Sequence, residues 1–167
     1  MPVEGRPRST SPGIHTNGYT LARTVLFDEY TVEDRPQELG GESVGEALLR
    51  VHRSYLRPIQ ALLEVDLAKG LAHITGGGLP GNLQRILPDG CEAVVNYDSW
   101  DRPSLFSLIQ REGDVPEADM RQTFNLGVGL VAAVRKADAQ QALERLEAIG
   151  ELPVPIGRIA AVSGDGG

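Results

Sequence analysis

A glycine-rich run near the middle of the chain gives the strongest indication of ligand chemistry. It reads His73-Ile74-Thr75-Gly76-Gly77-Gly78-Leu79-Pro80-Gly81-Asn82-Leu83. A short strand is predicted to lead into it over 71–75. Because glycine has no Cβ, backbone N–H groups in such a run can approach a ligand closely, and at a strand-to-helix junction they favour an anion. The residues alone leave this interpretation and a simple tight turn about equally open.

The same run contains a literal G-x-G-x-x-G match, formed by Gly76, Gly78 and Gly81. A dinucleotide site also needs a long helix after the loop and an acidic residue about 20 positions further on. Asp98 has a suitable offset, but Pro88 stops the following helix too early. A Walker A loop is excluded because the chain contains no Gly-Lys-Ser or Gly-Lys-Thr.

A second polar segment near the start of the chain contains His15, Thr16 and Asn17. A first helix is predicted to begin near Thr16 or Asn17, so either residue can serve simply as its N-cap. His15 can equally be a surface residue. From the residues alone, the capping interpretation is the simpler one.

A third segment, Thr123-Phe124-Asn125-Leu126-Gly127-Val128-Gly129, places Asn125 before an almost wholly apolar stretch. That stretch, 126–134, predicts a strand buried on both faces. The structural interpretation of Gly127 and Gly129 is that they allow close packing or a bulge.

Other residue types predict no further chemistry. The histidines at 15, 52 and 73 have no metal-ligand spacing with Cys91, so no metal site is expected. Cys91 is the only cysteine, which excludes an intrachain disulfide. There is no G-x-S-x-G elbow, and the carboxylates are scattered. No residue is therefore assigned as catalytic.

The elements that must position these segments are short and mixed. Twenty glycines and 11 prolines in 167 residues predict many tight turns. A Ser43-x-x-Glu46 capping box predicts one helix, further helices are expected over 103–112 and from 138 to 149, and strands over 91–97 and 156–162. Because strands and helices do not alternate regularly, the fold class is expected to be α+β, a mixed α/β sandwich.

Composition bounds the organisation and the partners. Residues 13–162 are expected to form one domain, after a flexible lead-in over 1–12 and before a frayed tail over 163–167. The net charge of −7 argues against nucleic-acid binding. No apolar run approaches the roughly 20 residues of a membrane span, and the start lacks a signal-peptide pattern. A cytoplasmic protein with no membrane partner is expected.

Four segments taken together carry a more specific signal. They are HTNGYTLAR, HITGGGLPGNLQRILP, LFSLIQREGDV after a Trp-Asp-Arg-Pro step, and MRQTFNLGVGLV. Their order and wording resemble the C-terminal domain of aminoimidazole ribonucleotide synthetase, also called phosphoribosylformylglycinamidine cyclo-ligase. The resemblance runs from about Gly13 to about Val162 and implies a mixed, largely antiparallel sheet flanked by helices.

The resemblance implies a ligase of purine biosynthesis that uses ATP and Mg²⁺ to close the imidazole ring of formylglycinamidine ribonucleotide. In such enzymes an N-terminal ATP-binding domain supplies most ATP and Mg²⁺ contacts and the homodimer interface. The chain alone is then expected to bind neither tightly and to be inactive. The alternative is a free-standing, non-catalytic ribonucleotide-binding or interaction module of the same fold.

The resemblance also implies which residues face the substrate cleft. Those expected to bind substrate or phosphate are His15, Thr16, Asn17, His73, Thr75, Gly76, Gly77, Gly78 and Asn82. The glycine loop is assigned to phosphate or ribonucleotide, and His15, Asn17 and His73 are assigned to positioning. Asn125 is a weaker candidate.

Overall fold

The computed structural model describes residue 11 and residues 13–162; the rest of the expected lead-in and the expected tail lie outside them. The helices are α1 (Tyr19–Glu29), α2 (Val44–Leu48), α3 (Leu56–Leu63), α4 (Gly78–Gln84), α5 (Ser104–Glu112), α6 (Glu117–Thr123) and α7 (Ala139–Glu147). Two 3₁₀ turns, η1 (Gln37–Leu39) and η2 (Lys136–Asp138), complete the helical elements. The strands are β1 (Ala68–His73), β2 (Cys91–Val95), β3 (Leu130–Val134) and β4 (Gly157–Ala161).

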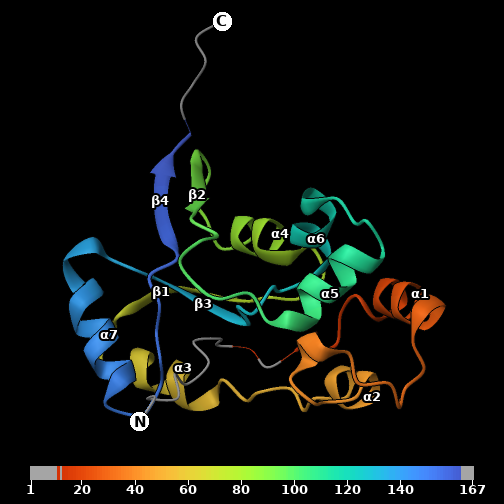
Figure 1. Ribbon diagram of the computed structural model, residues 1–167. Helices are drawn as coiled ribbons and strands as arrows, with labels where there is room; N and C mark the ends of the chain where they lie inside the picture. Colours follow the sequence, from red (N-terminus) through yellow and green to blue (C-terminus); the bar gives the residue numbers. More distant parts are fainter. Residues whose placement is uncertain (1–10, 12, 163–167) are drawn as a thin grey trace, which may run out of the picture.

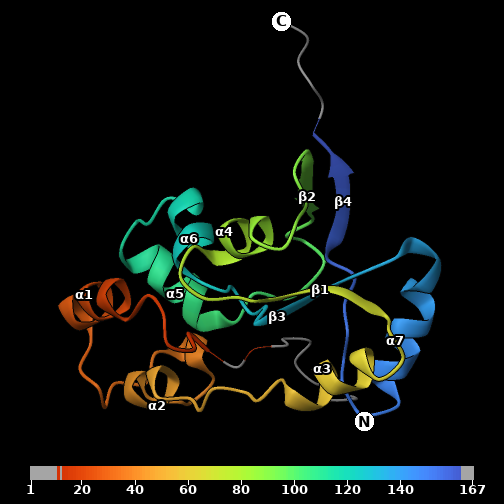
Figure 2. The same ribbon diagram turned by 180° about the vertical axis from the view of Figure 1, so that it is seen from behind.

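The strands pair antiparallel, which confirms the α+β class. Strand β1 pairs with β3, with Leu71 opposite Ala132, and β2 pairs with β4, with Ala93 opposite Ile159. Within the described residues they form two separate two-stranded sheets instead of one mixed sheet. The β1–β3 ribbon crosses the middle of the molecule, with α1, α2 and α5 at one end and α3 and α7 at the other (Figure 1, Figure 2).

Two apolar clusters hold the parts that matter for the site. The larger one joins α1, α2, α5 and α6 and includes the fully buried rings of Phe106 and Phe124. The smaller one contains Ile74 and Leu79, which flank the glycine run, together with Trp100. Burying such side chains is the main favourable term in folding. The glycine run is therefore anchored on both sides by core residues.

The start of α1 differs from the expected one. The helix begins at Tyr19, and neither Thr16 nor Asn17 caps it; its N-cap is Gly18, in the left-handed region at φ 76°. A Cβ on Gly18 would lie 2.3 Å from the ring of Phe124. The chain thus needs a glycine at this close approach, and the helix begins only after it.

The expected strand over 126–134 is also corrected. Strand β3 begins at Leu130 and is half-buried, whereas Leu126 at φ 51° and Gly127 at φ 99° form a left-handed turn. A Cβ on Gly127 would lie 2.7 Å from the Pro103 ring. The apolar stretch is buried because it packs in the core as a turn, and an apolar run cannot by itself distinguish that from a strand.

Other expectations agree with the structure. Ser43 and Glu46 form both hydrogen bonds of the capping box at α2, and α5, α7, β2 and β4 lie where they were predicted. The flexible lead-in was predicted through residue 12, but Ser11 is buried and donates its N–H to the Gly127 carbonyl at 2.8 Å. In the described part of the chain, every helix is too short or too polar to cross a bilayer.

Candidate functional site

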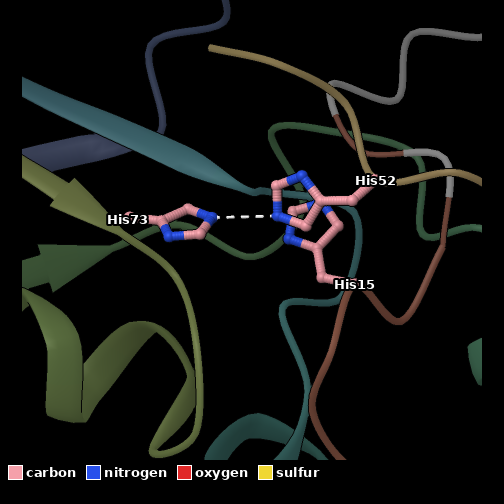
Figure 3. A group of neighbouring side chains, drawn as sticks. All are labelled: His15, His52 and His73. Atoms are coloured by element: carbon pink, nitrogen blue, oxygen red, sulfur yellow. Dashed lines mark hydrogen bonds between the residues drawn. The ribbon is translucent and has the colours of Figure 1, made fainter. Parts of the chain in front are cut away.

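Three histidine rings meet beside the end of strand β1. His73 is the last residue of β1, His15 comes from the segment before α1, and His52 comes from the segment before α3 (Figure 3). The ring centroids lie 3.9 Å apart for His15 and His52, 5.2 Å for His52 and His73, and 5.9 Å for His15 and His73. We call these three residues the histidine cluster. They are all the histidines of the chain.

His15 is fixed in the cluster by its buried neighbours. It is 5% exposed and has φ 63°, an uncommon conformation for a residue with a side chain. Its Nε2 lies 2.6 Å from Ser11 Oγ and 3.2 Å from the Tyr55 hydroxyl. Its Nδ1 is buried and has no hydrogen-bond partner among the described residues. Backbone strain together with an unpaired polar atom is typical of functional sites.

Gly129 makes the room for this arrangement. A Cβ at Gly129 would lie 1.9 Å from the Tyr55 hydroxyl and 2.3 Å from Cε1 of His15. The close-packing interpretation of this glycine is therefore correct, and the packed groups belong to the site.

Burial favours the uncharged form of His15 and of His73. It lowers the pKa of His15 to about 4, with further lowering by His52 and His73 and a weak opposing contact with the Ile74 carbonyl. The pKa of His73 is also lowered, first by burial and then by His52. Burial raises the pKa of the Tyr55 hydroxyl, which therefore stays protonated. The His15 and His73 side chains thus offer imidazole lone pairs, not positive charge.

His52 was not predicted as a site residue. Its Nδ1 lies 2.7 Å from the Arg53 carbonyl oxygen, and its Nε2 lies 3.1 Å from Nε2 of His73. His52 and His73 line an open pocket of about 330 Å³, together with Arg53, Ser54, Tyr55, Leu56, Ile59 and Leu130. The metal-ligand spacings sought in the sequence apply to ligands from one short motif, whereas these three come from distant segments. The one usable signal in the sequence was that the chain contains only three histidines, which could have drawn attention to His52.

The glycine loop, Thr75–Gly78, begins two residues after His73. Asn82 of α4 holds it from inside, because its Nδ2 donates to the carbonyls of Gly78 at 2.7 Å, Thr75 at 3.2 Å and Gly76 at 3.3 Å. Thr75 Oγ1 donates to Asn82 Oδ1 at 3.1 Å. Gly76 and Gly77 are exposed, and their N–H groups donate to no other described residue. The loop therefore presents backbone donors outward while its carbonyls are satisfied inside.

The loop does not belong to a dinucleotide-binding unit. Strand β1 pairs antiparallel with β3, and α4 has only seven residues. A dinucleotide fold needs parallel strands joined by a long helix. Helix α4 begins at Gly78, earlier than the stretch after Gly81 suggested, because Gly77 at φ 96° turns the chain directly into it.

The remaining predicted residues divide into two groups. Asn17 is half-buried, and its Oδ1 lies 3.8 Å from the position of a Cβ on Gly76, so the first polar segment adjoins the glycine loop. Thr16 is exposed between His15 and Asn17. Asn125 is buried, donates to the Gly13 carbonyl at 2.9 Å and accepts from the Gly127 N–H at 2.8 Å. Both ends of Asn125 are thus used within the fold.

Comparison with known proteins places this arrangement in context. Residues 8–166 match the family model described as AIR synthase related protein, C-terminal domain. The chain is similar to proteins named phosphoribosylformylglycinamidine cyclo-ligase. The one from Sorangium cellulosum is 52% identical over 156 residues, covering 91% of this chain and 44% of that protein. The one from Anaeromyxobacter sp. (strain Fw109-5) is 46% identical over 155 residues, covering 93% and 45%. The one from Thermoanaerobacter sp. (strain X514) is 46% identical over 156 residues, covering 92% and 46%. The chain spans less than half the length of these relatives.

Proposed function

Since this chain belongs to the family of AIR synthase related C-terminal domains, we propose that it forms the C-terminal half of a phosphoribosylformylglycinamidine cyclo-ligase of purine biosynthesis. The observation that carries the proposal is a sequence identity of 46% to 52% with relatives of that name, over at least nine tenths of the chain. In the reaction, ATP phosphorylates the formyl amide oxygen of formylglycinamidine ribonucleotide. A nitrogen of the substrate then attacks the activated carbon, the ring closes, and phosphate leaves with that oxygen.

We assign the glycine loop to a phosphate of the ribonucleotide or to the transferred phosphoryl group. The exposed N–H groups of Gly76 and Gly77 are unused donors, and such donors bind phosphate oxygens. Asn82 holds the loop carbonyls inward, so the donors are fixed before the ligand arrives. Preorganised donors are the main source of charge stabilisation in phosphoryl transfer.

His15, Asn17 and His73 are assigned to positioning the substrate. The lowered pKa values of His15 and His73 make them neutral hydrogen-bonding groups near pH 7, so they do not act as charged phosphate clamps. Asn17 reaches the loop beside Gly76. These three side chains supply orientation, which is worth several kcal/mol when it holds reacting atoms in place.

ATP and Mg²⁺ are assigned chiefly to an N-terminal half that the chain does not contain. The groups gathered at the site are imidazoles, hydroxyls and backbone amides, whereas Mg²⁺ prefers carboxylate and phosphate oxygens. The site residues of this chain therefore do not fit Mg²⁺, and no step of the reaction is assigned to that ion here. A homodimer of the complete enzyme in the cytoplasm belongs to the same proposal.

The segment around His52 supports a missing partner half. Leu49, Val51 and Leu56 are 78%, 86% and 60% exposed and lie on either side of His52 in the sequence. Exposed apolar side chains so close together in the sequence are consistent with an interaction surface. If the N-terminal half covers them, hydrogen exchange of 49–56 slows on adding that half. Unchanged exchange would place its docking surface elsewhere.

Reconstitution tests the proposal directly. The purified chain is expected to show no ATP-dependent ring closure, and addition of the N-terminal domain of a similar cyclo-ligase is expected to restore it. Full turnover by the chain alone would contradict the proposal that ring closure requires the N-terminal half. Ribonucleotide binding by the chain, with no activity in any reconstituted mixture, would favour the alternative of a free-standing binding module.

The loop assignment has its own matched pair of variants. Gly76 does not have a positive φ, and its nearest neighbour to an added Cβ is Asn17 Oδ1 at 3.8 Å, so the Cβ of alanine or of aspartate fits there. We expect Gly76→Asp to weaken ribonucleotide binding at least about tenfold by repelling phosphate, while Gly76→Ala stays within about twofold. Calorimetry with the reconstituted enzyme measures both. Equal affinities for the two variants would rule out the loop as the phosphate site.

A further inference from the structure

The histidine cluster has the composition of a transition-metal site. One nitrogen from each of His15, His52 and His73 lies within 4.8 Å of the other two. We propose that these three side chains bind one divalent transition-metal cation of the Zn²⁺ type. This site is distinct from the ATP-bound Mg²⁺ of the proposed function, and its test does not depend on ring closure.

The distances are close to those that coordination requires. Zn²⁺ binds imidazole nitrogen at about 2.0–2.1 Å with tetrahedral geometry, which puts two ligand nitrogens about 3.3 Å apart. The Nε2 atoms of His52 and His73 are already 3.1 Å apart. The widest separation allowed by the 4.8 Å limit would have to close by about 1.5 Å. His73 is exposed and His52 half-buried, so their rings can make that adjustment.

The hydrogen bonds around His15 and His52 select tautomers that leave a lone pair on one nitrogen of each ring. His73 must shift its proton from Nε2 to Nδ1 when the cation replaces its 3.1 Å hydrogen bond to His52. Since the Arg53 carbonyl can only accept, Nδ1–H of His52 donates to it, and Nε2 of His52 keeps its lone pair. Ser11 Oγ donates to the Gly13 carbonyl at 3.1 Å and therefore accepts from Nε2–H of His15. That leaves the lone pair on Nδ1 of His15, the buried atom without a partner. A backbone carbonyl behind a ligating histidine is a regular feature of metal sites.

The chemistry of the donors selects the class of cation. Three neutral imidazoles suit Zn²⁺, Cu²⁺, Ni²⁺ and Co²⁺, whereas Mg²⁺ and Ca²⁺ prefer oxygen ligands. Three protein ligands leave a fourth position open, which is the arrangement of catalytic zinc sites and not of structural ones. His52 and His73 line the open pocket of about 330 Å³. The fourth ligand is then water or an oxygen of a small anion in that pocket.

Titration with Co²⁺ and Zn²⁺ tests the site in the chain as it stands. We expect one Co²⁺ per chain, with the intense visible absorption of a four-coordinate ion, and displacement of Co²⁺ by Zn²⁺. His52→Gln and His73→Gln are each expected to weaken Zn²⁺ binding at least about tenfold, since even outer-shell changes cost 10–100-fold. Both side chains lie outside the buried core, so the variants are expected to keep the wild-type circular dichroism spectrum.

Cys91→Ser provides the matched control. Cys91 is the only thiol in the chain and lies in β2, outside the cluster. The control is expected to bind Zn²⁺ within about twofold of wild type. Absence of Co²⁺ and Zn²⁺ binding, unchanged affinity in both histidine variants, or loss of binding in Cys91→Ser would each overturn the proposal.

Discussion

The glycine loop and the histidine cluster are joined by a single residue, Ile74, yet they satisfy their polar groups in opposite ways. In the loop, Asn82 uses both ends of its side chain to hold Thr75, Gly76 and Gly78. In the cluster, Nδ1 of His15 is buried without a partner, and the rings of His52 and His73 bond mainly to each other and to one carbonyl.

This difference separates structural polar groups from those available to a ligand. The loop side chains are committed to the fold, so the loop offers only its backbone donors, which suit an anion. The cluster offers lone pairs, which suit a cation or a hydrogen-bond donor. Neighbouring sites of opposite character can hold opposite parts of one substrate.

Replacing the glycine at the base of the loop is expected to have the largest effect. A Cβ on Gly78 would lie 1.8 Å from the Arg121 carbonyl oxygen, and Gly78 has φ 58°. Backbone cannot yield as a side chain does, so Gly78→Ala is expected to cost about 3 kcal/mol or more of unfolding free energy. Gly81→Ala is the control, because nothing lies within 4 Å of its Cβ. In a helix it should gain up to about 1 kcal/mol. Urea denaturation that gave equal midpoints for the two variants would refute this account of the loop.

Removing the Asn82 side chain is the next largest change. Asn82→Ala leaves the buried Gly78 carbonyl without its 2.7 Å donor, which is expected to cost about 2 kcal/mol. His73→Gln, in the cluster, is expected to stay within about 0.5 kcal/mol of wild type, because the side chain is exposed. The same denaturation measurement compares them. If His73→Gln proved the more destabilising, the cluster would be the structural region and the loop the free one.

Gly129→Ala tests the cluster by crowding it. The added methyl would meet the Tyr55 hydroxyl and His15 Cε1, which are side-chain atoms and not backbone, so a cost of about 1–2 kcal/mol is expected. Zn²⁺ binding should weaken with it. Tyr55→Phe in the Gly129→Ala background removes the nearest atom and should recover part of the stability. No recovery would indicate that His15, and not Tyr55, limits the space.

Local signals in the sequence were sufficient for most helices and for two strands. The Ser43 and Glu46 capping box and the proline before α5 act over a few residues, so their consequences can be derived without the fold. The turn at Leu126 could not be derived this way. Its left-handed backbone is set by packing against Pro103 and Trp100, whose indole N–H donates to the Leu126 carbonyl at 2.8 Å.

The site was predictable where residues are consecutive and unpredictable where they are distant. The glycine loop could be recognised as a loop from its letters, although the role of Asn82 in holding it required coordinates. The family resemblance predicted that His15 and His73 face the same cleft. His52 reaches the cluster because the segment before α3 directs its side chain toward His73 at the end of β1 (Figure 3), and no local sequence pattern encodes that approach. The need for a glycine at position 129 could not be predicted either, because it is set by Tyr55 and His15, two side chains remote in sequence.

The smallest predicted effect concerns the ion pairs of α6, which support the glycine loop and not the histidine cluster. Gly78 packs on the Arg121 carbonyl of α6, and α6 is held by Glu117, which pairs with Arg102 at 2.6 Å and with Arg121 at 2.8 Å. Hydrogen bonding to Arg102 lowers the pKa of Glu117 to about 2 against an ordinary value of 4.5. A carboxyl group whose pKa is lowered by folding contributes its full stabilisation when the pH is above its pKa in the unfolded state. That contribution is lost as pH falls from about 4.5 to about 2.

Glu117→Gln is therefore expected to be less stable than wild type at pH 7, with the gap closing below pH 4.5. The group is 37% exposed, and solvent screens such a pair, so the gap should stay below about 1 kcal/mol. Urea denaturation at pH 7, 5 and 3 measures it, and raising the salt concentration should shrink it at pH 7. Zn²⁺ binding at pH 7 should be unaffected, because the cluster lies outside this ion-pair group. A variant that lost metal binding as well would show that the two regions are coupled and not independent.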